Sequence, residues 1–154
     1  MIERPSIAEY LPHKDAMLLL DRLVDWDVQK HTLTAEVDIQ QDSFFFEPSL
    51  GGIPAWVGFE YMAQSIAALS GLHGRLVHNT EPKIGCIMSV RSFTAMIPAF
   101  PPGNTVQVKV HELFREQSVV SFDCVLVVED REVCTAVINA IELDDPCTFF
   151  KETT

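Results

Sequence analysis

An acid and an amide stand four residues apart in the segment GGIPAWVGFEYMAQ, residues 51–64. The acid is Glu60, the amide is Gln64, and most of their neighbours are apolar. At this spacing two side chains share one face of an α-helix, so Gln64 could hold the carboxylate of Glu60 in position. Burial penalises charge and therefore favours a protonated carboxyl, which is the form that a general acid needs. Glu60 is thus the first candidate for catalysis.

A purely structural role for Glu60 stays open at this point. An acid in the first turn of a helix interacts favourably with the helix dipole while its head remains in solvent. Other chemistry has less support. The histidines His31, His73, His78 and His111 are expected in loops or on strand surfaces, no pair of them has metal-ligand spacing, and no GxSxG motif is present.

These two residues require a helix that positions them. Proline is tolerated in the first helical turn, so a helix is expected to begin at Pro54 or Ala55. We expect it to run to about Ser70 and to be closed by Gly71 or Gly74. Its apolar residues fall on nearly every face, which is typical of a helix that is enclosed by other structure.

Strand patterns on both sides of this helix supply the enclosure. Period-two alternation and turn residues predict strands at 17–27, 31–39, 84–93, 105–114, 118–129 and 133–143, with a short helix at 6–10. The first two strands are expected to form a hairpin, and the last three an antiparallel meander. The sequence therefore predicts an α+β domain in which a long antiparallel sheet wraps one long central helix.

Composition bounds the possible partners and compartment. The 154 residues suit one domain, 1–154, and the formal net charge of -11 disfavours nucleic acid and anionic lipid as partners. No run of 18 apolar residues occurs, so no membrane insertion is expected, and the acidic N-terminus does not read as a signal peptide. Four separated cysteines without a CxxC pair indicate buried thiols, and we expect a cytoplasmic protein.

Four motifs in the same order carry a family resemblance: LPHKDAMLLLDRLVDWD, IPAWVGFEYMAQSIA, PGN followed by TVQVKV, and VCTAVINAI. Together they resemble the hot-dog-fold 3-hydroxyacyl-(acyl carrier protein) dehydratases over nearly the whole chain. The AWVGxEYMAQ variant is most similar to the branch found in aryl-polyene pigment pathways. The resemblance implies a hot-dog fold and the dehydration of 3-hydroxyacyl thioesters in polyene or fatty-acid-like chain building.

The resemblance also implies roles for individual residues. Glu60 takes the place of the helix carboxylate that handles the 3-hydroxyl. The main-chain N–H groups at the helix start, at Ala55 and Trp56, take the place of the oxyanion donors. The LPH segment lines the acyl tunnel in related dehydratases, so Pro12 and His13 are expected near the substrate. Gln64 is expected beside it as well, as a substrate-binding residue.

One departure from the family pattern concerns the catalytic base. The family's histidine falls at Phe46 in this chain, and no histidine occurs between His31 and His73. Three routes remain open: His13 acts as the base, a heterodimer with a histidine-bearing paralogue completes the site, or the chain binds acyl groups without catalysis. An acyl thioesterase in which Glu60 activates water is a further alternative.

The resemblance implies a carrier protein and a second subunit as partners. The substrate is expected on the phosphopantetheine arm of an acyl carrier protein, with no bound cofactor and no metal. A homodimer or a heterodimer is expected because the fold usually pairs sheets edge to edge. Phe46 with Phe44 and Phe45 would either wall a tunnel or plug the loop into the core. Four basic residues would form either a rim for the carrier protein or scattered surface charge: Lys83, Arg91, Lys109 and Arg115.

Overall fold

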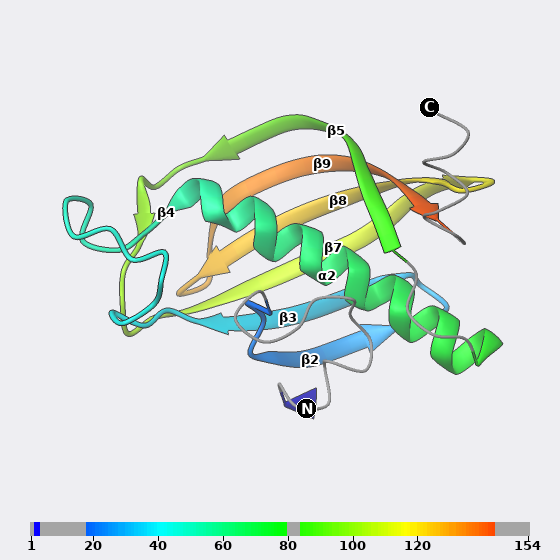
Figure 1. The fold of residues 1–154 in the computed structure, drawn as a ribbon, viewed down its shortest axis with the longest axis horizontal. Helices are drawn as coiled ribbons and strands as arrows, with labels where there is room; N and C mark the ends of the chain where they lie inside the picture. The colour runs from blue at the N-terminus through cyan, green and yellow to red at the C-terminus, as the bar shows by residue number, and fades with distance from the viewer. Residues whose placement is uncertain (1, 4–17, 80–83, 144–154) are drawn as a thin grey trace.

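A computed structural model of the chain describes residues 2–3, 18–79 and 84–143 (Figure 1). The long helix α2 (Gly58–His73) lies against a seven-stranded antiparallel sheet with the order β1-β2-β3-β7-β8-β9-β5. Its strands are β1 (Ile2–Glu3), β2 (Arg22–Asp27), β3 (Thr32–Asp38), β5 (Ile84–Ala95), β7 (Thr105–Glu116), β8 (Val119–Val128) and β9 (Arg131–Leu143). The hot-dog architecture, a sheet around one central helix, is confirmed.

The strand pairing follows the predicted patterns. In β3 buried residues alternate with partly exposed ones, as the period-two pattern requires. The predicted hairpin forms between β2 and β3, and its turn is held because Oδ1 of Asp27 accepts hydrogen bonds from the N–H groups of Gln29 and Lys30 at 2.9 Å each. The strands β7, β8 and β9 form the expected meander, with β5 beside β9.

Two details of the strand prediction were wrong. The predicted strand 17–27 begins only at Arg22, because the described residues before it, 18–21, run as irregular backbone. The sequence also concealed a two-stranded pair, β4 (Ile53–Pro54) with β6 (Ala99–Phe100). This pair joins the helix start to the proline-rich segment, which was expected to be only a turn. The predicted helix at 6–10 lies outside the described residues.

The helix begins where it was predicted and ends later. A 3-10 turn, η2 (Ala55–Val57), leads directly into α2. The chain does not close at Gly71 or Gly74, but continues through a π-helical turn, η3 (Gly74–His78), to a left-handed Asn79 (φ 52°). Gly71 and Leu72 are buried, so packing outweighs the cost of glycine in a helix.

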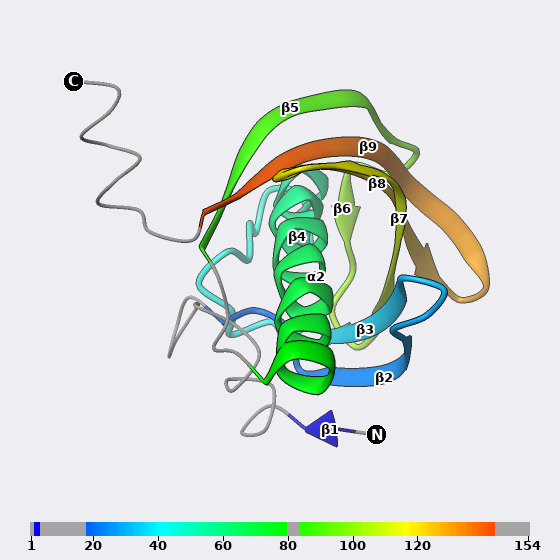
Figure 2. The ribbon, with the colours of Figure 1, turned by 90° about the vertical axis from the view of Figure 1, so that its right-hand side faces the viewer.

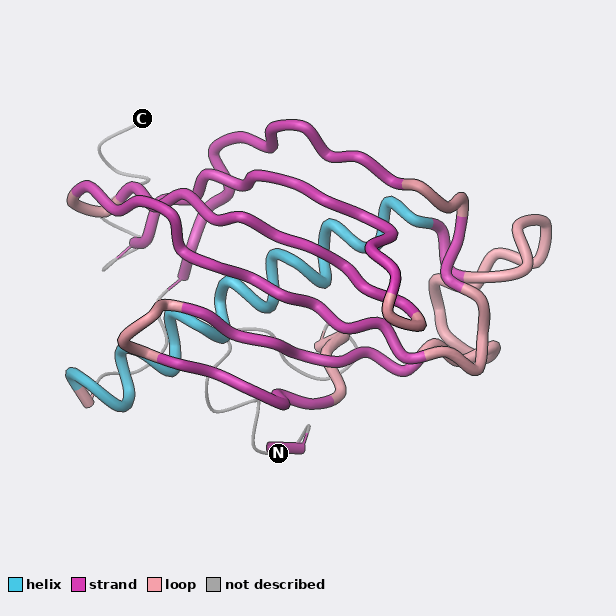
Figure 3. Tube along the Cα trace, turned by 180° about the vertical axis from the view of Figure 1, so that it is seen from behind, coloured by secondary structure: helices cyan, strands magenta, loops and turns pink. Residues whose placement is uncertain are grey.

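The sheet curves around α2 on one side, as Figure 2 shows along the helix and Figure 3 shows from behind. At Gly58 the helix lies close to β8, since an added Cβ would lie 2.5 Å from Cδ1 of Leu126. The apolar side chains of the helix and sheet form one core, whose fully buried members include Met62, Leu72, Phe100 and Phe122. The absence of a side chain at Gly58 therefore lets the helix start sit directly on the sheet.

The opposite side of the helix is less covered than the apolar pattern predicted. Trp56 is 66% exposed, and the partly exposed residues that follow it recur at helical spacing: Phe59, Glu60, Ala63, Ala67 and Ser70. Such a stripe faces one direction along a helix. The expected enclosure is therefore confirmed only in part: no residue of α2 is fully exposed, but these positions form its least covered side. We call these six residues the open stripe.

Candidate active site

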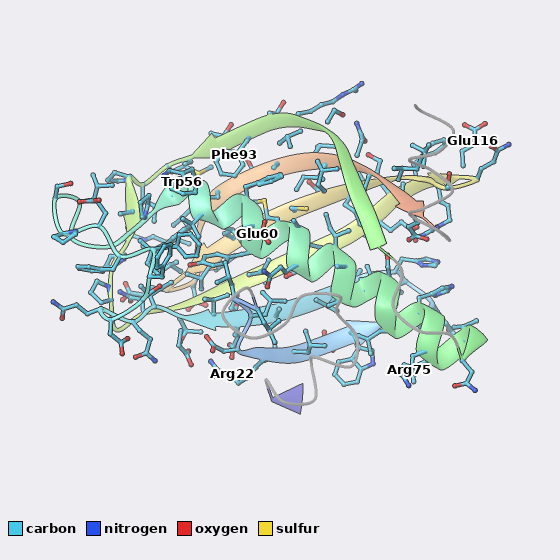
Figure 4. All side chains as sticks on the ribbon, in the orientation of Figure 1. Arg22, Trp56, Glu60, Arg75, Phe93 and Glu116 are labelled. Atoms are coloured by element: carbon cyan, nitrogen blue, oxygen red, sulfur yellow. The ribbon has the colours of Figure 1, made fainter. Side chains whose placement is uncertain are left out.

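Glu60 lies in the first turn of α2, on the open stripe and partly exposed. Figure 4 shows it near Trp56, at the end of the helix opposite Arg75. Gln64, one turn later, donates a hydrogen bond from Nε2 to Oε1 of Glu60 at 3.1 Å. The predicted contact between these two residues therefore forms, and it restrains the carboxylate on the stripe.

Gln64 is itself fixed from its other end. Its side chain is 0% exposed, and its Oε1 accepts a hydrogen bond from the N–H of Leu19 at 2.8 Å. Because the amide oxygen is used in this way, the amide nitrogen must face Glu60. The N–H of Leu19 is given to a side chain instead of a neighbouring strand, which explains why β2 begins only at Arg22.

Leu19 is a site residue that the sequence did not reveal. Its contribution is a main-chain N–H, and every residue except proline has one, so no residue type could signal it. Only the approach of residues 18–20 to the helix gives that N–H a role. The carboxylate, the amide and this N–H form one chain of hydrogen bonds from the segment before β2 to the open stripe.

The two predicted oxyanion donors differ in their surroundings. The N–H of Ala55 donates to the carbonyl oxygen of Pro98 at 3.0 Å, so in this structure it is not available to a substrate. For the N–H of Trp56, no acceptor is recorded among the described residues. It also lies at the positive end of the helix dipole. The geometry thus favours Trp56 over Ala55 as the donor.

Phe46, at the position of the family's histidine, is half-buried in the loop 39–52 that joins β3 to β4. A bridge between Glu47 and Gly52 and a hydrogen bond from the N–H of Phe46 to the carbonyl of Ser43 hold the loop. Phe45 packs against the core and lies edge-on to Trp56, with ring centroids 6.4 Å apart. Phe44 is 92% exposed, so Phe45, and not Phe44, anchors this loop to the core.

No described histidine side chain lies near Glu60. Nδ1 of His31 is 2.8 Å from Oε2 of Glu112, and the ring of His31 lies 5.5 Å from that of His73, the last residue of α2. At 1.5 Å per residue, His73 is about 20 Å along the helix from Glu60. His111 is exposed and pairs with Thr32, at the same end of the sheet. Pro12 and His13 lie outside the described residues.

The predicted basic rim divides into paired and unpaired members. Arg115 is committed to ion pairs with Glu112 at 2.6 Å and with Glu142 at 3.1 Å. Arg91 and Lys109 are exposed, and Lys83 lies outside the described residues. Lys109 and Arg115 share β7, whereas Arg91 lies on β5, and β8 and β9 separate these two strands, so the three described cations do not form one rim.

The described part of the chain contains no group of three His, Cys, Asp or Glu residues arranged to hold a metal ion. Within the same residues, no helix is long and apolar enough to cross a membrane. Cys124 and Cys134 are buried free thiols, and burial raises their pKa to about 12 and about 11. They therefore remain protonated and unreactive at neutral pH. Cys147 and the side chain of Cys86 are not described.

Comparison with known families decides the membership of the chain. The model of the ApeP-like family, described as ApeP dehydratase, matches residues 5–151. The chain belongs to the ApeP-like dehydratase family. This assigns it to a dehydratase class, as the motifs around Glu60 implied.

Solved structures support the same fold for this ApeP-like chain. It is similar to a chain of the dehydratase heterocomplex ApeI:P from Xenorhabdus doucetiae, with a TM-score of 0.86 and 22% identity over 96% of this chain and 97% of that one. A sigma28-regulated virulence protein from Campylobacter jejuni follows with a TM-score of 0.68 and 16% identity, covering 90% and 88%. A hypothetical thioesterase with coenzyme A from Streptococcus pneumoniae has a TM-score of 0.61 and 11% identity, covering 79% and 84%.

Proposed function

We propose that this chain is one subunit of a cytoplasmic 3-hydroxyacyl thioester dehydratase and that a histidine-bearing paralogue completes its active site. Membership of the ApeP-like dehydratases supports the reaction class. The observation that carries the proposal is the carboxylate of Glu60, held on the open stripe by a fully buried amide. The substrate would arrive on the phosphopantetheine arm of an acyl carrier protein, in polyene or fatty-acid-like chain building.

The reaction is a β-elimination, and this chain carries part of the required machinery. Glu60 would protonate the departing 3-hydroxyl, so that water leaves as the C2 proton is removed by a base. The charge that develops on the thioester oxygen needs a preorganised donor, and the N–H of Trp56 fits this role. Gln64 would keep the carboxyl aimed at the substrate while these charges move.

The base is the part that we assign to a second chain. Phe46 occupies the family's histidine position, and the described histidine side chains lie at the far end of the helix. The similar heterocomplex from Xenorhabdus doucetiae is an assembly of two different dehydratase chains. A paralogue of the same fold would carry this histidine in the loop that corresponds to 39–52. If the open stripes of the two chains face each other, that histidine would lie close to Glu60 of this chain. The alternative is that His13 of this chain acts as the base, and the test below distinguishes it from a histidine of the paralogue.

The surface offers an interface for such a partner. Among the described residues, β5 is the last strand of the sheet and pairs only with β9. Exposed edge strands are templates for pairing with another chain, and Ile87 and Val90 leave apolar surface uncovered on β5. The open stripe with Trp56 is a second uncovered surface. A partner of the same fold would extend the sheet at β5 and cover the stripe.

The test is a dehydration assay on the purified chain, alone and mixed with the histidine-bearing paralogue, with 3-hydroxyacyl carrier protein as substrate. We expect enoyl product only from the mixture. Glu60→Gln in the mixture should lower turnover by about 10²–10⁴-fold, because the proton donor is lost. Glu129→Gln, an exposed acid in the β8–β9 turn, is the matched control and should leave turnover unchanged.

Each alternative gives a different result in the same assay. Turnover by the chain alone that is lost in His13→Ala would assign the base to His13 and overturn the shared site. Full turnover of the Glu60→Gln mixture would mean that the chain is a non-catalytic partner. Release of free thiol without enoyl product would identify a thioesterase instead of a dehydratase.

A further inference from the structure

A pocket of about 470 Å³ lies where the end of β3, the loop 39–52 and the start of α2 meet. Figure 1 shows these segments together at the end of the molecule where α2 begins. Tyr61 and Leu19 line the pocket, whereas Glu60 does not. The pocket borders the proposed dehydratase site through Leu19 and the loop 39–52, but the dehydration steps described above place no reacting group in it.

The charge of the pocket is one-sided. Asp21, Asp38 and Asp42 are among its lining residues, and within the described part of the chain no lysine, arginine or histidine lines it. Two of these acids also have structural partners: Arg22 binds Asp38 at 2.6 Å, and Asp21 accepts the N–H of Asp38 at 2.8 Å. No hydrogen bond or ion pair of the third, Asp42, is recorded among the described residues. Such a wall repels anions and attracts cations.

To this wall the side chain of Tyr61 adds a hydroxyl group that has no protein partner among the described residues. Tyr61 is 2% exposed, and within the described residues its hydroxyl has no recorded hydrogen bond. Burial, and then the nearby carboxylate of Asp21, raises the pKa of Tyr61, so the phenol stays neutral. A neutral phenol can both donate and accept a hydrogen bond. The hydroxyl therefore marks the pocket as a place where a polar ligand would be stabilised.

Aromatic rings complete the lining. Phe44 and Phe45 line the pocket together with Tyr61, and the two phenylalanine rings are edge-on at 5.3 Å. Flat cations gain energy from aromatic faces, and their N–H groups match carboxylate oxygens. We propose that this pocket binds a flat organic cation, an amidinium or guanidinium group on an apolar body, through Asp21, Asp42 and Tyr61. Leu19, Val37 and Ile53 would contact the apolar part.

Three probes of one shape and different charge test the proposal on the full-length chain. They are benzamidinium, which is positive, benzamide, which is neutral, and benzoate, which is negative. In calorimetric titration we expect benzamidinium to bind at least about tenfold more tightly than benzamide, and benzoate not to saturate. The affinity of the protein for benzamidinium should fall as salt is added. Methyl NMR signals of Leu19, Val37 and Ile53 should shift with benzamidinium.

Two variants with matched controls locate the binding energy. Tyr61→Phe should weaken benzamidinium about tenfold, and Ser65→Ala, which removes a buried hydroxyl outside the pocket, should not. Asp42→Asn should weaken it about threefold, whereas Asp130→Asn in the β8–β9 turn should leave it unchanged. Asp42 is exposed and has no recorded partner, so Asp42→Asn tests the pocket even if Tyr61→Phe does not fold.

Three results would overturn the proposal. They are equal affinity for benzamide and benzamidinium, saturable binding of benzoate at the same methyl groups, and benzamidinium shifts confined to other parts of the protein. The proposal would also be overturned if Asp42→Asn and a correctly folded Tyr61→Phe both bound benzamidinium as tightly as the parent chain. None of these results bears on the dehydratase proposal, because Glu60 does not line the pocket.

Discussion

At the scale of single residues, Gln64 has the most demanding position in the molecule. Its side chain is fully buried, and it uses both ends of its amide. Its oxygen holds the segment before β2, and its nitrogen holds Glu60. A residue that only accepted hydrogen bonds could satisfy the first contact but would oppose the second.

Gln64→Glu separates these two contacts. The new carboxylate can still accept the N–H of Leu19, but it faces Oε1 of Glu60, and two carboxylates in one site raise one pKa. The folded protein then binds a proton that the unfolded chain lacks at neutral pH, so its stability should fall as pH rises. Relative to the unsubstituted chain, we expect a loss of at least about 2 kcal/mol between about pH 5 and pH 8, measured by urea unfolding.

The exposed Gln41 supplies the control for this prediction. Gln41→Glu adds the same charge in solvent and should show no such pH dependence. A stability of Gln64→Glu that does not change with pH would mean that the contact between Gln64 and Glu60 is absent in solution.

At the scale of elements, one arginine ties β2 to β3 beside the segment that holds Gln64. Arg22 of β2 binds Glu36 at 3.0 Å and, with two nitrogens, Asp38 of β3, which also accepts from Thr105 of β7 at 2.9 Å. The hydrogen bonds from Arg22 hold the pKa of Asp38 below its ordinary value of 3.8. This cluster fixes the register of three strands just after the segment that holds Gln64.

Arg22→Met should therefore destabilise the protein by about 1–2 kcal/mol at neutral pH, a value reduced for the partial exposure of the pair. Because the folded pKa of Asp38 is lowered, this contribution is present above about pH 4 and is lost as pH falls through the folded value. The difference between the two proteins should shrink towards about pH 2. Urea unfolding at each pH measures it.

A second arginine provides the comparison for Arg22. Arg131→Met, at an exposed position of β9, should have little effect at any pH. A difference between Arg22→Met and the parent chain that stays constant from neutral to acid pH would contradict the assigned role of Asp38.

At the scale of the whole molecule, the described part of the chain leaves two surfaces incompletely covered. The sheet covers one side of α2, while the open stripe and the edge strand β5 leave apolar side chains uncovered. Exposed apolar patches of this kind mark interaction surfaces. The proposed paralogue would cover both and would supply the base that the described part of this chain lacks.

Val90→Glu tests that interface. Val90 lies in β5 and is 40% exposed, so a charge there is tolerated by the folded chain but must be desolvated in a strand pair. We expect association with the paralogue to weaken at least about tenfold, measured by analytical ultracentrifugation. Leu113→Glu, at a 53% exposed position of β7, is the control and should associate normally. Equal association of both variants would place the interface elsewhere.

The sequence by itself determined the elements and the chemistry they carry. The period-two patterns predicted the six long strands, the proline at the helix start predicted where the helix begins, and the spacing of Glu60 and Gln64 predicted their contact. These features are local, because strand alternation, helix caps and neighbours one turn apart depend only on nearby residues.

Only the tertiary structure decided what surrounds those residues. It brought the N–H of Leu19 to Gln64, gave the N–H of Ala55 to Pro98, and carried the helix past Gly71 and Gly74. It also left one face of the helix partly exposed and placed three acids in the lining of the same pocket as Tyr61. These contacts join segments that are far apart in the chain. They depend on main-chain groups and on packing, and the types of the residues involved do not reveal either.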